Sequence, residues 1–209
     1  MQVSYGRIAA RGLERIAALS DGVFAIAMTL IVLEIQVPAL PPGSTDGDLW
    51  SALLLLGHSF VTYLLSFLTL GIFWAGQQTQ LNHMARADRD LSWIYVGFLA
   101  FVALMPFTTS LLSEHIELRL ALLIYWANIA VLGGILFGAW VYAKRAGLLK
   151  DEAGPAVDAA IRRRILVAQA LYGFGALLCV FSTAWSIAWI VLVQLNFATG
   201  PRLPGLRHI

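Results

Sequence analysis

The side chains that can carry acid–base, nucleophilic or metal chemistry are few in this sequence and do not cluster. The four histidines lack the spacing of metal ligands and stand at His58, His83, His115 and His208. Gly57-His58-Ser59 looks locally like a serine site, but no second motif supports it, and neither an H-E-x-x-H zinc helix nor a P-loop is present. The single cysteine, Cys179, excludes a disulfide framework and a cysteine-rich metal site. We therefore expect no enzyme activity, no bound metal and no cofactor.

One acidic residue is unusual because it lies within an apolar segment. Asp21 falls about one helical turn inside the hydrophobic boundary of the first apolar run, which begins near Ile16. A carboxylate at that depth is costly unless it meets a cation or hydrogen-bond donors within the protein. We expect Arg15 and polar groups on neighbouring helices to supply these partners, so that Asp21 anchors its own helix to the others.

The same segment carries a stripe of branched aliphatic side chains along one helical face. At 100° per residue, Ile26, Leu30, Leu33 and Val37 fall within about 40° of one another. The polar residues at positions 20 and 21 point well away from this stripe. Glu34 adjoins it at the outer end, where a carboxylate raises the local cation concentration. Ordinary helix packing or lipid contact is the simplest interpretation of such a stripe.

Composition indicates the environment in which these residues lie. Of the 209 residues, 59% are hydrophobic and 12% are charged, whereas soluble domains are about 45–50% apolar and about 25% charged. A soluble fold of this size cannot bury so much apolar surface, so we expect an all-α integral membrane protein. At about 20 residues per transmembrane helix, the chain holds six helices in a single domain over residues 1–209. The expected helices cover residues 16–37, 51–77, 91–112, 118–142, 165–181 and 184–198.

Two positions predict breaks within these segments. Pro106 interrupts the third apolar run and predicts a kink near its end. The last apolar block, residues 165–197, is too long for one span, and Ser182-Thr183 offers a polar turn that divides it into two short helices.

The basic residues predict how the helices cross the membrane. With the N-terminus inside, 13 of the 14 lysines and arginines fall in inner segments, and the outer loops keep Arg119 alone. The positive-inside rule then predicts six spans with both termini inside. The N-terminal residues lack the pattern of a cleavable signal peptide, so the first helix is expected to stay in the protein. The run Arg162-Arg163-Arg164 is typical of an anchor that reaches lipid headgroups, and no nucleic-acid partner is expected.

Several motifs resemble those of one known family. The pattern R-x-x-x-L-S-D-G at residues 15–22 and the run from Phe24 to Pro38 resemble the first helix of the transmembrane protein 175 family, the potassium channels of endosomes and lysosomes and their prokaryotic relatives. The family hallmark is R-x-x-x-F-S-D, in which Leu19 here replaces the phenylalanine. The resemblance continues at Phe73-Trp74, at residues 88–93 (D-R-x-L-x-W) and at residues 106–109 (P-F-T-T). Many relatives carry histidines shortly after the tryptophan, whereas this chain has Gln77 and Gln78.

The resemblance implies a homotetramer of six-helix subunits in which the first helices line a central potassium pore. The implied constriction layers are Ile26, Leu30 and Leu33, with Thr29 as an added hydroxyl ring and Glu34 at the pore mouth. The implied structural network, which holds the first helix to its neighbours, comprises Arg15, Ser20, Asp21 and Trp74. The chain is thereby expected to be a prokaryotic-type, single-repeat channel of the inner membrane, with potassium as its permeant ion and membrane lipids as its surroundings.

A secondary transporter is the alternative function. Such a protein would couple protons or cations to its substrate through Asp21 or Glu34. Against it, the chain shows no inverted repeat and no helix broken at mid-membrane by paired Gly and Pro residues. Apolar rings gate a channel by dewetting, and potassium has a lower dehydration cost than sodium, so the channel interpretation has the right sign of selectivity.

Overall fold

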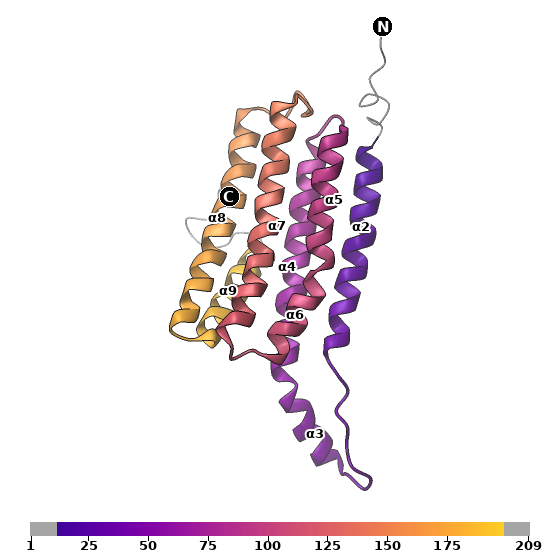
Figure 1. Cartoon of the computed structure of the whole chain (residues 1–209), viewed down its shortest axis with the longest axis vertical. Helices are drawn as coiled ribbons and strands as arrows, with labels where there is room; N and C mark the ends of the chain where they lie inside the picture. Colours follow the sequence, from indigo (N-terminus) through magenta and orange to yellow (C-terminus); the bar gives the residue numbers. More distant parts are fainter. Residues whose placement is uncertain (1–11, 199–209) are drawn as a thin grey trace.

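The apolar segments fold into long helices that run side by side (Figure 1). The computed structural model describes residues 12–198, and no strand is present within that range. The helices are α2 (Leu13–Leu30), α3 (Asp46–Leu55), α4 (Gly57–Asn82), α5 (Arg89–Ala103), α6 (Met105–Glu114), α7 (Arg119–Arg145), α8 (Pro155–Leu177) and α9 (Thr183–Ala198), with 3-10 turns η1 (Ile31–Glu34) and η2 (Leu178–Val180). Arg7, Arg11, Arg202 and Arg207, which contribute to the predicted orientation, and His208 lie outside the described residues.

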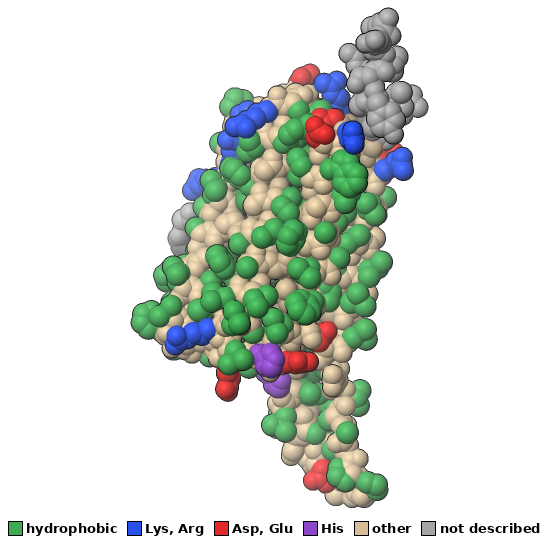
Figure 2. Space-filling model, viewed as in Figure 1, with side chains coloured by type: hydrophobic (Ala, Val, Ile, Leu, Met, Phe, Trp, Pro, Cys, Tyr) green, Lys and Arg blue, Asp and Glu red, His purple; other side chains and the backbone are tan. Residues whose placement is uncertain are grey.

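Five helical stretches of the described chain are long and apolar enough to cross a membrane. They are Leu13–Glu34, Gly57–Asn82, Arg89–Glu114, Arg119–Arg145 and Pro155–Val180, and α9 is a shorter apolar helix. Figure 2 shows large green apolar side chains over the middle of the molecule and charged side chains gathered towards its ends. Many of these apolar residues are well exposed, as lipid-facing residues are in a membrane protein. The chain is a multi-pass membrane protein.

Two of the observed helix boundaries differ from the predicted ones. The predicted second segment, residues 51–77, is divided at Leu56 into α3 and a longer α4. The predicted fifth segment began at residue 165, but α8 begins ten residues earlier at Pro155, because proline at the first helical position needs no N–H acceptor. Hydropathy alone missed these ten residues, almost three helical turns, because they contain the three arginines at positions 162–164.

Pro106 marks the division of the third segment into α5 and α6. α5 ends at Ala103, and the N–H of Leu104 still bonds to the carbonyl of Ala100. Proline has no N–H to continue this ladder, so the helix axis changes before α6 resumes at Met105. At the same end of the bundle as α6, the chain turns at Phe181 and Ser182 between η2 and α9 (Figure 1).

α3 extends beyond the end of the bundle, as Figure 1 shows, and none of its residues is buried. Thr45 caps it: its N–H and its hydroxyl each donate to Asp48 Oδ2 at 2.8 Å. These donors lower the pKa of Asp48, so the cap holds at neutral pH and weakens when that carboxyl is protonated. Trp50 on the same helix is 65% exposed, so α3 presents a large apolar side chain to its surroundings.

Two loops meet at the end of the bundle that carries the N-terminus of α2. The α4–α5 loop and the α7–α8 loop pair through an isolated bridge between Met84 and Leu149. The N–H of Ala85 donates to the carbonyl of Leu148 at 2.8 Å, and the N–H of Lys150 donates to the carbonyl of His83 at 2.9 Å. The basic residues of both loops therefore lie at one end of the molecule.

A buried polar cluster joins four helices in the centre of the bundle. Ser66 and Thr69 of α4 contact the hydroxyl of Tyr125 on α7 at 3.3 and 3.1 Å. Thr109 of α6 donates to Ser66 at 2.7 Å, and the Gln194 amide of α9 donates to Thr69. Polar side chains that find one another across helices stabilise membrane proteins, where the apolar surroundings offer no other partner.

Replacing Tyr125 with phenylalanine is expected to destabilise the protein by about 0.6–1.7 kcal/mol, the usual range for such bonds between membrane helices. The reason is that the hydroxyls of Ser66 and Thr69 lose a partner on α7 while the ring packing is kept. The measurement is thermal unfolding of the purified protein in detergent. Tyr63→Phe is the matched control, because Tyr63 is half-buried and its ring stacks on Phe67 at 5.9 Å without a hydroxyl contact among the described residues. Equal stability of both variants would contradict the prediction.

Candidate functional site

The packing of α2 gives this helix one buried and one exposed face. Its buried residues follow the 3.6-residue helical period and are Ile16, Ser20, Phe24 and Ala27, continued by Ile31 in η1. This face packs against α4, α5 and α6. The Phe24 ring lies 6.0 Å from the ring of Phe98 on α5. Because only one side of α2 is held by the bundle, the other side is available for contacts outside the subunit.

The exposed face of α2 is aliphatic along its C-terminal half. Ile26 is 61% exposed, Leu30 is 42% exposed and Leu33 is 69% exposed. Thr29 is exposed beside them, and its hydroxyl donates to the Ile26 carbonyl at 2.8 Å. This bond uses the hydroxyl proton within the helix, so the Thr29 oxygen presents lone pairs to its surroundings. The face thus offers aliphatic layers with one row of oxygen acceptors.

About one and a half helical turns before this face, α2 is tied to α4 by side-chain hydrogen bonds. Trp74 donates from its indole Nε1 to Asp21 Oδ1 at 2.8 Å, and the Gln78 amide donates to the same oxygen at 2.8 Å. The Gln77 amide donates to the Ser20 hydroxyl at 2.8 Å, and this hydroxyl donates to the carbonyl of Ile16. Asp21 thereby receives two donors from one neighbouring helix.

Three of the four residues assigned to the structural network, Ser20, Asp21 and Trp74, come together at this contact. Arg15 lies apart, and its exposed side chain makes no ion pair or hydrogen bond with residues 12–198. It lies six positions before Asp21, which places the two side chains about 120° apart around an α-helix and about 9 Å apart along it. An intrahelical ion pair at this spacing is out of reach, so α4 supplies the partners of Asp21 instead.

The sequence reasoning did not identify Gln77 and Gln78 as partners of α2. It noted them as replacements for histidines, but their positions three and four residues after Trp74 place all three on one face of α4. That spacing is the signal that identifies them. Their amides donate without a titratable group, so the contact carries no ionisable partner for Asp21.

Glu34 lies at the outer end of the aliphatic face, at the end of η1. It lines a small polar recess together with His58 and Ser59 of α4 and Ser113 and Glu114 of α6. The Ser113 hydroxyl donates to the Ser59 hydroxyl at 3.1 Å, which joins α4 to α6 at this level. Among the described residues, no group of three His, Cys, Asp or Glu side chains has the arrangement of a metal site.

The comparison with known proteins decides the family. The model of the family described as endosomal/lysosomal potassium channel TMEM175 matches residues 15–106. A potassium channel of Streptomyces collinus is 34% identical over 165 residues, which cover 77% of each chain. The chain belongs to the TMEM175 family. This result confirms the resemblance found in the first half of the sequence.

Relatives of this family also match the second half of this chain. A potassium channel of Chamaesiphon minutus is 35% identical over 182 residues, which cover 84% of this chain and 86% of the relative. The crystal structure of a lysosomal potassium-selective channel TMEM175 homolog from Chamaesiphon minutus superposes with a TM-score of 0.76 at 29% identity, over 90% of this chain and 96% of the other. The fold of that channel therefore extends into the second half of the chain, where the motifs are weak.

Replacing Ser20 with alanine is expected to destabilise the α2–α4 contact by about 1–3 kcal/mol, the cost of a buried polar group without a partner. Gln77 is fully buried, and its Oε1 already lacks a partner among the described residues, so the variant leaves its whole amide unsatisfied. The double variant Ser20→Ala/Gln77→Leu is the control, because removing both partners restores an apolar contact. Thermal unfolding of both variants checks this, and a double variant less stable than Ser20→Ala would contradict it.

Proposed function

We propose that this TMEM175 member conducts potassium passively through a central pore that forms where the α2 helices of four copies meet. The observation that carries the proposal is the aliphatic face of α2, exposed in the subunit while the opposite face is fixed by α4, α5 and α6. The family and its named potassium channels supply the activity. One subunit has one such face, so several copies are needed to enclose a path.

In this pore, Ile26, Leu30 and Leu33 form successive aliphatic rings. Such rings exclude water when the pore is narrow and so act as a gate. Aliphatic walls do not replace the hydration shell of an ion, so selectivity comes from pore width and from the Thr29 oxygen acceptors. Potassium sheds water at a lower cost than sodium, which gives the preference its direction. No cofactor takes part in this scheme.

The orientation in this proposal places both termini inside the cell. The α4–α5 and α7–α8 loops, which are joined by backbone hydrogen bonds, bring Arg86, Arg89, Lys144, Arg145 and Lys150 to one end of the molecule. Arg119 lies at the start of α7, at the opposite end. This distribution favours the basic end as the cytoplasmic one, and Glu34 then lies at the outer mouth, where it attracts cations. In this proposal, the protein lies in a prokaryotic inner membrane with its basic end in the cytoplasm.

The decisive experiment is electrical recording of the purified protein in planar bilayers, in potassium and then in sodium. We expect unitary currents that are larger in potassium and that increase with concentration without coupling to a proton gradient. Cross-linking of the same sample is expected to give a tetramer. Flux that saturates and follows the proton gradient, with no unitary currents, would favour the secondary transporter and overturn the channel.

A further inference from the structure

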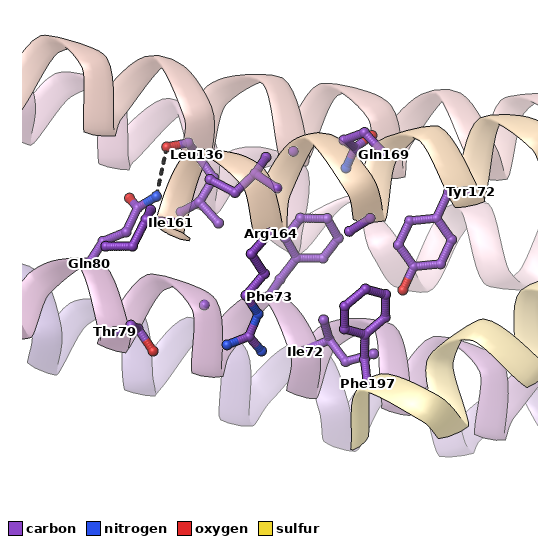
Figure 3. Close-up of a pocket in the computed structure, with 14 residues that line it drawn as sticks. Ile72, Phe73, Thr79, Gln80, Leu136, Ile161, Arg164, Gln169, Tyr172 and Phe197 are labelled. Carbon is purple, nitrogen blue, oxygen red and sulfur yellow. Dashed lines mark hydrogen bonds between the residues drawn. The ribbon is translucent and has the colours of Figure 1, made fainter. Parts of the chain in front are cut away.

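The three consecutive arginines at the start of α8 have three different surroundings. Arg162 donates to Asp158 at 2.9 Å, which neutralises it within the same helix. Arg163 is exposed. Arg164 is half-buried and lines a cavity between α4 and α8, into which its side chain points in Figure 3. The run therefore contains one arginine that is turned towards the inside of the protein.

The cavity exists because α8 packs chiefly on α7 and α9 and leaves a space against α4. It contains about 570 Å³ that no atom fills, part of it open to the surroundings. Most of its wall is apolar and includes Ile72, Phe73, Gly76, Leu136, Ile165 and Phe197. The space extends along α8 from the level of Ile161 to that of Tyr172, which is about 16 Å at the rise of an α-helix.

The charge in this cavity is not balanced by the described chain. No Asp or Glu lines it, and Arg164 forms no ion pair or hydrogen bond with residues 12–198. Two of the polar residues nearby bond elsewhere: Gln80 donates to the carbonyl of Leu136 at 3.0 Å, and Thr79 donates to its own helix at 2.8 Å. Gln169 and the hydroxyl of Tyr172, which has no partner among the described residues, also line the cavity, but neither carries a charge that would balance Arg164. A half-buried guanidinium beside an apolar space calls for an anion attached to an apolar chain.

We infer that this cavity binds one anionic phospholipid of the membrane, with its phosphate on Arg164 and part of an acyl chain between α4 and α8. The position agrees with the inferred occupant, because Arg164 directly precedes the apolar part of α8 and so lies at the level of lipid headgroups. Phe73 and Gly76 in the wall flank Trp74 and Gln77, which hold α2. A bound lipid thus braces the helix that positions α2. This inference does not depend on ion conduction.

The test is a binding titration of the full-length protein in detergent with dioleoyl phosphatidylglycerol, followed by native mass spectrometry and by thermal unfolding. Dioleoyl phosphatidylcholine and inorganic phosphate are the reference ligands. We expect phosphatidylglycerol to bind and to raise the melting temperature, and the zwitterionic lipid to bind about tenfold more weakly, as the loss of a charge-assisted contact implies. Inorganic phosphate is not expected to raise the melting temperature, because it has no chain to fill the cavity.

Matched variants separate this site from general surface charge. Arg164→Gln is expected to lower the affinity for phosphatidylglycerol about tenfold, while Arg163→Gln, which removes the same charge from the surface, changes it less than about twofold. Arg164→Lys keeps the cation and retains most of the binding. Ala168→Leu fills the cavity and weakens binding, whereas Ala170→Leu adds the same volume at an exposed position of the same helix and does not.

Several results would overturn the inference. Equal losses in Arg164→Gln and Arg163→Gln would show that the lipid is attracted by diffuse charge. Wild-type binding in Ala168→Leu would show that no acyl chain enters the cavity. Competition by inorganic phosphate at concentrations equal to those of the lipid would indicate a plain anion site. If Arg164→Gln does not fold, the comparison of Arg164→Lys with the two alanine variants still decides the outcome.

Discussion

Replacing Ile26 with asparagine is expected to raise potassium flux about tenfold or more and to bring the potassium-to-sodium ratio close to one. In the proposed pore, four amides would then replace one aliphatic ring, and the water that they hold removes the dewetting barrier at that layer. A barrier lowered by about 1.4 kcal/mol already gives a tenfold increase. The measurement is potassium and sodium flux into liposomes that contain equal amounts of protein. Leu30→Ser is expected to act in the same direction at the next layer.

The control for this prediction is a polar substitution on a helix away from α2. Leu166 of α8 is 55% exposed, comparable to Leu30, and α8 lies on the side of the bundle opposite α2 (Figure 1). Leu166→Ser is therefore expected to leave flux and selectivity unchanged. Wild-type conduction in both Ile26→Asn and Leu30→Ser would exclude α2 as the pore helix. Equal leaks in these variants and in the control would indicate membrane damage instead of an altered pore.

Replacing Asp21 with alanine is expected to abolish assembly or expression of the channel. The variant removes the acceptor of both Trp74 and Gln78, at about 1–3 kcal/mol per subunit. It leaves the Gln77–Ser20 bond as the remaining side-chain hydrogen bond between α2 and α4 among the described residues, so the aliphatic face is held less firmly in its orientation. Each of the four copies in the proposed tetramer is destabilised by this amount. The variant therefore destabilises the tetramer more than it destabilises a single subunit. Size-exclusion chromatography of the detergent-solubilised protein measures it.

Asparagine at the same position distinguishes the hydrogen bonds from the charge. Both donors bond to the same oxygen, Oδ1 of Asp21, and the carbonyl oxygen of an asparagine can accept them in the same place. Asp21→Asn is therefore expected to assemble and to conduct with nearly normal selectivity. A stable Asp21→Ala tetramer with altered selectivity would show that Asp21 acts on ions and not on helix packing.

The helices were predictable from hydropathy, because a membrane-spanning helix must be long and apolar whatever its neighbours are. The ends of the helices were less predictable. α8 begins at Pro155 and includes Arg162–Arg164, whereas hydropathy assigns such charged residues to a loop. The break between α3 and α4 at Leu56 directly precedes Gly57-His58-Ser59, and this polar interruption is too short for hydropathy to divide the segment into two helices.

The candidate site was predictable where it depends on the period of one helix. Ile26, Leu30 and Leu33 share a face because of their spacing alone, and their exposure follows from the burial of the opposite face. The partners of Asp21 depend on which helix packs against α2, which no local pattern specifies. Arg15 was expected because it is close in sequence, but a helix places it on another side from Asp21, and α4 provides the donors.

The 3-10 turn at the end of α2 determines how long the narrow path is. Side chains three residues apart eclipse one another in a 3-10 turn, and each residue advances about 2 Å, so Leu33 stands directly over Leu30 about 6 Å away. Ile26 lies about 6 Å before Leu30 at the α-helical rise. In the proposed pore, an ion crosses about 12 Å of mainly aliphatic wall, interrupted by the row of Thr29 oxygens, so the narrow path is a short tube and not a single ring. In this proposal, dewetting has to act over the length of the tube, so its barrier depends on several side-chain layers and not on one.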